Sequence, residues 1–496
     1  MKRQNINLAI ALSAIVMPIL LTGCGGSDES TGSVSVPTPG SGTTTPTTPA
    51  IPAAPVVSKQ PESVTQSPYA KVEFSATDAK SYRCQLNTEA VSECVSPVIF
   101  YPLAAQQHQL QIWQVAADGR QSQPAVVRWQ VNSIFPANST ERPHADLATT
   151  TVQPALSNDN SWRGIFRINC DLSHSGYVDP IVYPGKVDAA HLHNFYGNVL
   201  LDQHSTIETL FSTGDASCQG NTLNRSAYWV PALLAPSYDA DTGQRLLDKN
   251  GDPAWKVVPA VVGGDDQAHE VFYYSAGVDD VSSIQSIPLG LKMIAGNPAG
   301  KPGQEQDSAI VRWHCQSWES SDGKNPRWSA GIPQCLAPDR VRMDIFFPSC
   351  WNGLDLDSAD HKSHLAYPVK STTSAGMICP GTHPVPIVRV SFHYAFGVKP
   401  DVYDPKTKSS QGWRLASDSY DSTATTLGGM SLHGDWFNAW HPEALQKILD
   451  VCIKKRLDCH DGNLGNGFRL NGTRPGAQNT PEIINKGLGH GAHGGH

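Results

Sequence analysis

The chain has 496 residues, of which 39% are hydrophobic and 17% charged, and 37 lysines and arginines against 45 acidic residues give a net charge of −8. At about 100–200 residues per domain, this length predicts two to four domains, and the acidic balance argues against a duplex-DNA-binding protein, whose surface is basic. The 42 glycines and 37 prolines favour short strands joined by turns over long helices. Eleven cysteines indicate an oxidising compartment unless they bind metal.

Residues 1–23 have the pattern of a secretory signal peptide. A basic start is followed by an apolar run of 14 residues, Leu8–Leu21, which is too short to span a hydrocarbon core about 30 Å thick. The run ends in Leu21-Thr22-Gly23-Cys24, which resembles a bacterial lipobox. This resemblance implies lipidation of Cys24 and anchoring to a bacterial membrane, at the outer membrane or cell surface, facing the extracytoplasmic side. The alternative is an ordinary signal peptide with a chance cysteine.

A tether and a small module are expected next. Residues 24–53 are rich in Gly, Ser, Thr and Pro, so they cannot bury enough apolar surface to offset the entropy of ordering, and a flexible tether is predicted. Residues 54–132 change to short alternating strands. Cys84 and Cys94 are close enough in sequence for a disulfide across a hairpin.

Three segments of this module resemble bacterial immunoglobulin-like surface modules: Ser81–Cys84, Cys94–Pro97 and Val127–Val131. The resemblance implies a small β-sandwich that serves as a spacer or a weak ligand binder.

A polar linker is predicted over residues 133–156, the main domain over 157–474 and a Gly/His-rich, disordered tail over 475–496. Within the main domain, strands are predicted at Ile165–Cys170, Ser226–Val230, Trp255–Val258, Glu270–Ser275, Leu289–Ile294, Val311–Cys315, Val341–Phe347 and Ile387–Ala395. Near the end, Pro442 and an apolar repeat from Leu445 to Ile453 predict a helix with one buried face. The predicted fold class is therefore mostly β: a small immunoglobulin-like sandwich, then a larger disulfide-bonded β-sandwich-type domain with a C-terminal helix.

The cysteine count suits a disulfide framework. Without Cys24, ten cysteines remain, which is an even number. Only local pairs can be suggested from spacing, and these are Cys84–Cys94, Cys315–Cys335 and Cys452–Cys459. No Cys-x-x-Cys occurs in the sequence, which disfavours a zinc–thiolate site.

Three histidine clusters are the candidate metal-binding or catalytic residues. Two imidazoles of the first cluster share one face if the segment is extended, and the third cluster is expected in a turn. Neutral imidazole is the commonest metal ligand, so converging clusters would form a His/Asp site for a divalent transition metal such as zinc, with one position open to water. The alternative for each histidine is a surface or hydrogen-bonded core residue. The clusters are His191 with His193, Asp360 with His361 and His364, and His433 with Gly434 and Asp435.

Several motifs of the main domain resemble the secreted family known as domain of unknown function 1996. They cover residues 160–460 in order and include all three histidine clusters. The resemblance implies a secreted, disulfide-bonded, β-rich domain, often associated with cell walls, and it implies no reaction. The motifs are Asp179–Val182 with Pro184-Gly185, His191–His193 with Gly197-Asn198, Phe347–Gly353, Asp360–Pro368, Cys379-Pro380 with His383–Pro386, and His433–Asp435.

We hypothesise a surface-anchored extracytoplasmic enzyme that acts on a polysaccharide or related cell-wall polymer through this His/Asp site. The metal ligands would be His191, His193 and His433, and Asp360 would orient an imidazole. The catalytic set comprises His191, His193, Asp360, His361, His364, His433 and Asp435.

Other readings stay open, including whether the protein is an enzyme at all. A metal-free form would use a histidine base with Lys362 and Tyr367 in lyase-like proton abstraction. A non-catalytic cell-wall or glycan-binding lipoprotein would use the histidines structurally. A third reading is metal capture by the tail histidines. We expect no nucleic-acid partner, and membrane contact only through the lipid anchor.

Overall fold

The computed structural model describes residues 50–138, 140–157, 163–261, 272–319, 327–373 and 376–472. The signal peptide, Cys24, most of the tether and the Gly/His-rich tail lie outside these residues. Within the described part of the chain, no helix is long and apolar enough to cross a membrane.

The first strands form two sheets around a common core. Val72, Phe74, Ile112 and Trp129 are buried together in that core, and the Cys84–Cys94 disulfide joins two neighbouring strands. One sheet has the order β1 (Val56–Lys59), β3 (Ala70–Ser75), β6 (Val98–Phe100), and the other β2 (Val64–Thr65), β8 (Ala125–Val131), β7 (Gln107–Ala116), β4 (Ala79–Leu86), β5 (Ser92–Cys94). The likeness to immunoglobulin-like modules stays a prediction.

A seven-stranded sheet forms one layer of the main part of the chain. All of its neighbouring strands are antiparallel except β11 and β29, which run parallel. Side chains alternate along it, so that Val341, Met343 and Ile345 enter the core while Asp344 faces the other side. The order is β10 (Ala155–Leu156), β29 (Leu457–Cys459), β11 (Ile165–Ile168), β17 (Phe272–Ser275), β26 (Arg389–Gly397), β20 (Arg340–Phe346), β19 (Val311–Cys315).

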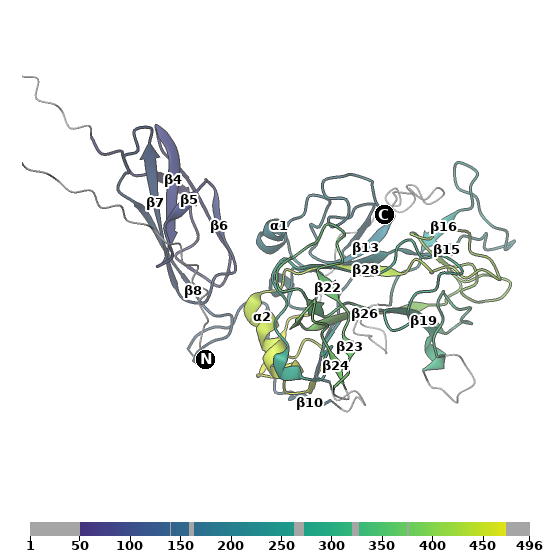
Figure 1. The fold of residues 1–496 in the computed structure, drawn as a ribbon. Coiled ribbons are helices and arrows are strands. Elements are labelled where there is room, and N and C mark those ends of the chain that lie inside the picture. The colour runs from purple at the N-terminus through teal and green to yellow at the C-terminus, as the bar shows by residue number, and fades with distance from the viewer. Residues whose placement is uncertain are drawn as a thin grey trace, which may run out of the picture. The chain divides into compact units, whose positions relative to one another are not determined.

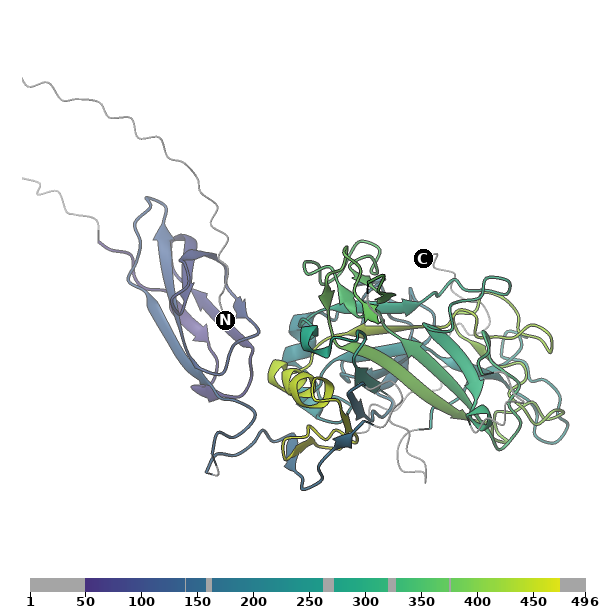
Figure 2. The same cartoon turned by 60° about the horizontal axis from the view of Figure 1, so that its bottom comes forward.

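A five-stranded sheet forms the second layer. Its Tyr228 ring lies 4.2 Å from Phe272 and 5.8 Å from Phe392 of the first layer, measured between ring centroids. These rings join the two sheets into a sandwich, with β13 and β28 in one layer and β26 in the other (Figure 1). Figure 2 shows the same ribbon turned by 60°. The order is β12 (His174–Gly176), β13 (His193–Gly197), β14 (Ala227–Pro231), β28 (His433–Phe437), β18 (Lys292–Gly296).

Short elements complete the structure. The smaller sheets are β16 (Trp255–Val257), β15 (Leu233–Pro236), β27 (Arg414–Leu415); β22 (Leu365–Ala366), β21 (Cys350–Trp351), β25 (Val385–Pro386); β23 (Val369–Lys370), β24 (Met377–Ile378); and β9 (Leu147–Thr149), β30 (Phe468–Leu470). The helices are α1 (Ile207–Ser212), α2 (Pro442–Lys447), the 3-10 turns η1 (Asn221–Leu223), η2 (Val281–Ser283) and η3 (Gln316–Trp318), and the π-helix η4 (Ile448–Ile453).

The mostly β prediction is confirmed, and so is the helix near the end, although its second half is a π-helix. Its apolar repeat from Leu445 to Ile453 is buried, as the periodicity predicted. Five disulfides are formed, and they include the three local pairs that spacing suggested: Cys84–Cys94, Cys170–Cys218, Cys315–Cys335, Cys350–Cys379 and Cys452–Cys459.

One local expectation is wrong. The segment His433-Gly434-Asp435 lies at the start of strand β28 and not in a turn. A Cβ at Gly434 would lie 3.0 Å from the Ile345 side chain, so the glycine serves close packing between the two layers.

Candidate functional site

The five-stranded sheet brings histidines from distant parts of the chain opposite the same residue of its central strand. β13 and β28 flank β14 on either side. His193 pairs with Pro231, and the register that pairs Asp435 with Trp229 puts His433 beside Pro231 as well. Directly paired residues point to the same face of a sheet, so both imidazoles leave the sheet on one side.

His191 joins this pair because the chain before β13 is extended. Leu192 is buried with Ala232 and Leu234 in a small apolar cluster, so the residues on either side of it turn the other way. The ring of His191 lies 4.2 Å from that of His193 and 5.0 Å from that of His433, between centroids. The potential ligand atoms of the three imidazoles all lie within 4.8 Å of one another.

Backbone carbonyls fix the tautomers of two of these histidines. The Nδ1 of His193 lies 3.1 Å from the Val178 carbonyl oxygen, and the Nδ1 of His433 lies 2.8 Å from the Ser431 carbonyl oxygen. A carbonyl oxygen only accepts, so each Nδ1 carries the proton and donates it. Each Nε2 then carries the lone pair, which is the arrangement that metal-binding histidines use.

Two buried carboxylates lie beside the imidazoles. Ligand atoms of Asp179, His193 and Asp435 also lie within 4.8 Å of one another. Burial raises the pKa of Asp179 to about 6, although it accepts hydrogen bonds from the backbone N–H groups of Ile181 and Val182. Burial, followed by the charge of Asp179, raises the pKa of Asp435 well above its usual range.

A bound cation would offset the free-energy cost of burying the two negatively charged carboxylates. Asp435 is 1% exposed, and its Oδ2 accepts no hydrogen bond from the described residues. That oxygen lies 3.9 Å from the Nε2 of His433. The donor set of three imidazoles and nearby carboxylates therefore fits a divalent transition metal.

The second histidine cluster forms a turn that faces this group. Asp360 accepts hydrogen bonds from the backbone N–H groups of Lys362 and Ser363 and from the Ser358 hydroxyl. The turn gives His361 a φ of 58°, a left-handed conformation that is uncommon outside glycine. The Nδ1 of His361 lies 2.8 Å from Asp357 Oδ1, so Asp357, and not Asp360, orients this imidazole.

Asp179, Asp360, His361, Lys362, His433 and Asp435 are among the residues that line a cavity of about 320 Å³. Lys362 donates a hydrogen bond to the Gly296 carbonyl oxygen at 2.9 Å. Burial lowers the pKa of Lys362, while Asp435 and Asp360 oppose that shift. The cavity is therefore lined by both buried carboxylates, by His433 and by residues of the 357–364 turn, whereas His191 and His193 do not line it.

His364 and Tyr367 are held elsewhere. His364 is buried, with Nδ1 at 2.9 Å from the Ser358 hydroxyl and Nε2 at 2.8 Å from the Lys292 carbonyl oxygen. The Tyr367 hydroxyl donates to the Phe346 carbonyl oxygen. Neither side chain lines the cavity, so a lyase-like site there would lack this tyrosine.

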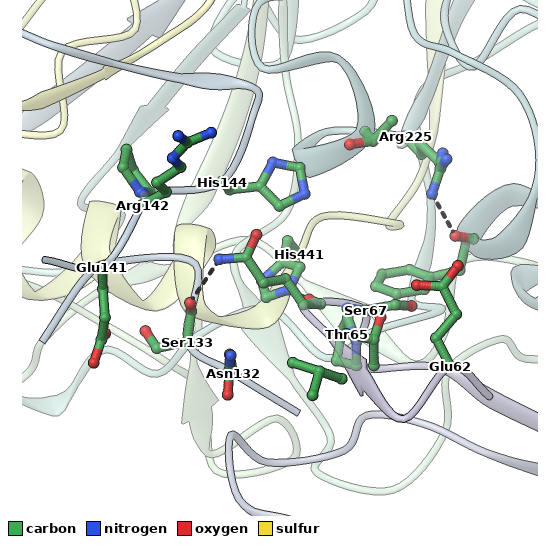
Figure 3. Close-up of a pocket in the computed structure, with 16 residues that line it drawn as sticks. Glu62, Thr65, Ser67, Asn132, Ser133, Glu141, Arg142, His144, Arg225 and His441 are labelled. Atoms are coloured by element: carbon green, nitrogen blue, oxygen red, sulfur yellow. Dashed lines mark hydrogen bonds between the residues drawn. The ribbon is translucent and has the colours of Figure 1, made fainter. Parts of the chain in front are cut away.

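A larger hollow of about 630 Å³ is drawn in Figure 3. Its lining includes His144, Arg225 and His441, and Arg225 donates a hydrogen bond to the Phe211 carbonyl oxygen at 2.8 Å. None of the catalytic candidates from the sequence lines this hollow. Burial lowers the pKa of His441 to about 4, so this imidazole is neutral at neutral pH.

Sequence reasoning missed Asp179 and Asp357 as site residues. Asp179 precedes His191 by twelve residues in a different loop, so spacing gave no reason to join them. The one sequence signal for Asp179 was the Asp179-Pro180 pair, which is typical of a turn. The Asp179 carboxylate accepts hydrogen bonds from the N–H groups of the residues that follow this pair. Asp357 was overlooked in favour of Asp360, which stands next to His361 in sequence.

Comparison with known proteins gives a family and remote structural likenesses. A family model described as "Domain of unknown function (DUF1996)" matches residues 179–440. No curated protein matches the chain. A solved structure named "SusE-like protein BT2857" aligns over 77% of this chain and 95% of its own, at 7% identity and a TM-score of 0.13, and a likeness of that size carries no argument.

Proposed function

This chain belongs to the family described as Domain of unknown function (DUF1996), and from that premise we propose that it is a metal-dependent enzyme that acts outside the cytoplasm on a polysaccharide or related polymer. His191, His193 and His433 would hold the metal. The signal peptide and lipobox motif support an extracytoplasmic, lipid-anchored location, and the five disulfides suit an oxidising compartment.

One observation carries the metal assignment. The carbonyl oxygens of Val178 and Ser431 hold the protons of His193 and His433 on Nδ1, which directs both Nε2 lone pairs toward a group that also contains His191.

The surrounding side chains would bind and orient the substrate. A bound transition metal would supply a Lewis acid for a carbonyl or glycosidic oxygen and would lower the pKa of a bound water. His361, which is oriented by Asp357 and lines the same cavity as His433, would move a proton at its Nε2. Lys362 would hold a polar substrate group near Asp435.

The test is the metal content of the full chain, expressed without an added affinity tag and analysed by elemental mass spectrometry. We expect about one tightly held transition metal per folded molecule, because two of the three ligands, His193 and His433, are buried and pre-oriented. A chain lacking residues 487–496 should keep that metal, since none of the proposed ligands lies in the tail. His191→Ala/His193→Ala should lose it, while the exposed His204→Ala should not.

The same variants then separate enzyme from binding protein. Degradation of a polymer by the metal-loaded chain, lost at least about 100-fold in His191→Ala/His193→Ala, would support the enzyme. Metal binding together with polymer retention but no turnover would favour the glycan-binding alternative, in which the metal staples loops. Absence of metal after reconstitution with zinc, copper and manganese would overturn the metal site.

A further inference from the structure

A second group of reactive side chains lies on the outer face of the seven-stranded sheet. The strand register places Ser391 of β26 between Tyr273 of β17 and Phe346 of β20. Two residues away along β26, Arg389 and His393 point to the same face. Ser391 therefore lies at the bottom of a well with four larger side chains as its walls.

A hydrogen-bonded chain runs through this well. The Ser391 Oγ lies 2.9 Å from His393 Nε2, and His393 Nδ1 lies 2.8 Å from Asp344 Oδ1. Asp344 pairs directly with His393 across the two strands. A carboxylate only accepts, so Nδ1 donates to Asp344, and Nε2 then accepts the hydroxyl proton of Ser391.

The carboxylate is held in its ionised form. Burial by itself would raise the pKa of Asp344, but His393 and Arg312 together hold it well below the usual range. Arg312 Nε lies 2.9 Å from Asp344 Oδ2. The Tyr273 and Phe346 rings also fix the imidazole, at 4.4 Å and 5.4 Å from its centroid.

We propose that Ser391, His393 and Asp344 form a second catalytic site, a serine hydrolase that cleaves esters of short acyl groups. Nucleophile, base and orienting carboxylate stand in the order and at the hydrogen-bond distances that this chemistry requires. Ser391 and His393 are the catalytic residues, and Asp344 is the positioning residue. The proposal is independent of the metal site, which lies on the other sheet.

The reaction balances with water as the only co-reactant. Ser391 Oγ forms a bond to the acyl carbon while its proton moves to His393 Nε2. The carbon–oxygen bond to the alcohol then breaks, and the alcohol leaves with that proton. Water, deprotonated by His393, attacks the acyl-serine, and the acid departs as the proton returns to Ser391. Arg389 lies on the same face of the sheet, and its guanidinium, which donates to the Ser275 hydroxyl at 3.0 Å, would turn from that bond to stabilise the oxyanion.

The shape of the well sets the substrate class. Ser391 is 2% exposed because it is the shortest side chain present, while its four walls are each partly exposed. Cross-strand neighbours have Cβ atoms about 5 Å apart, so Tyr273 and Phe346 stand about 10 Å from each other. The His393 imidazole already fills part of that interval, at 4.4 Å and 5.4 Å from the two ring centroids, so only a small acyl group could enter beside it.

The experiment is covalent labelling of the full chain with a fluorophosphonate probe, mapped by peptide mass spectrometry, beside hydrolysis of p-nitrophenyl acetate. We expect the label on Ser391 and ester hydrolysis at least about 100-fold faster than in Ser391→Ala. Ser282→Ala is the matched control, because Ser282 bonds directly to Asp280 without a histidine. Labelling should survive removal of metal with a chelator, which separates this site from the metal site.

His393→Asn separates catalysis from folding. The asparagine amide can still donate to Asp344 but offers no base to Ser391, so labelling should be lost while the melting temperature stays close to that of the unaltered protein. Asp344→Glu should recover part of the labelling rate that Asp344→Asn loses, because the glutamate restores an ionised acceptor. A chain that is unlabelled at Ser391 and hydrolyses the ester no faster than Ser391→Ala would overturn the proposal.

Discussion

Asp344 is 3% exposed and carries its charge inside a sheet. Its two oxygens contact His393 at 2.8 Å and Arg312 at 2.9 Å, each from a neighbouring strand. The pairing compensates for the desolvation of the charge, and removing one partner of such a group leaves the others buried without compensation. Whatever the chemistry of Ser391, the carboxylate also stabilises the fold.

We therefore expect Asp344→Asn to lower the free energy of unfolding by about 3–5 kcal/mol, measured by urea denaturation at pH 7. Because the folded pKa of Asp344 is depressed, its contribution is present above the unfolded pKa of about 3.9 and is lost as the pH falls below that value toward the folded pKa. Asp421→Asn is the control, since Asp421 is 98% exposed and should change stability by less than about 0.5 kcal/mol. Equal effects of the two substitutions would contradict this account.

At the scale of elements, the end of β18 fixes the position of His433. Gly296 pairs with His433 and has a φ of 83°. A Cβ at this position would press against the Leu432 carbonyl oxygen. The Gly296 carbonyl oxygen in turn accepts the hydrogen bond from Lys362, so one glycine connects the sheet with the turn across the cavity.

Gly296→Ala should destabilise the protein by about 3 kcal/mol, from left-handed strain and from the displaced Leu432 carbonyl together. It should also weaken metal binding, because His433 moves. Gly303→Ala is the matched control, since Gly303 has a φ of 80° but nothing within 4 Å of an added Cβ. This control should lose only about 1–2 kcal/mol and keep its metal affinity. Calorimetry on both variants separates the destabilisation caused by the left-handed backbone from that caused by the contact with Leu432. A zinc titration measures the metal affinity of each variant.

The presence of a strand was predictable from the alternation of apolar and polar residues and from the turn residues around it. The residues at which a strand begins and ends were less predictable. Val311–Cys315 matches β19 at both ends, because its alternation is bounded by turn residues. The strand predicted over Leu289–Ile294 lies instead at Lys292–Gly296. Leu289 and Leu291 are apolar for a different reason, since they pack into two hydrophobic clusters from the segment that precedes the strand.

The candidate site was predictable only where it depends on local geometry. Period two placed His191 and His193 on one face, and the structure puts their rings 4.2 Å apart. Convergence with His433 depends on β13 and β28 flanking the same strand, which no spacing in the sequence reveals. Asp360 and His364 stand beside His361 in sequence, yet hydrogen bonds commit the first to a turn and the second to the core.

At the scale of the whole molecule, disulfides tie together a chain with little helix to support it. The Cys170–Cys218 bond closes a separation of 48 residues and the Cys84–Cys94 bond one of 10. In the chain-entropy view, a longer closed loop removes more freedom from the unfolded state. Cys170 and Cys218 are also fully buried, so their loss removes packing as well.

Replacing Cys170 and Cys218 with alanine should cost about 4 kcal/mol in loop entropy alone, against about 2.7 kcal/mol for Cys84 and Cys94. Thermal unfolding of the two double variants, under oxidising conditions, measures the difference. The difference in stability between the two double variants should disappear when all samples are compared after complete reduction of the disulfides. A larger loss for the Cys84/Cys94 variant would show that local strain outweighs loop length.

The position of β28 in the chain has a consequence for the order in which the sheet forms during synthesis and folding. Residues 433–437 fill the place between β14 and β18, which are complete in the chain long before it. A chain made from its first residue onward must therefore hold two unpaired strand edges open until residues 433–437 have emerged, and such edges invite pairing with other chains. The sheet closes only when β28 inserts, and the same event delivers His433. Assembly of the three-histidine group therefore waits for β28, and metal occupancy would report that this strand is in place.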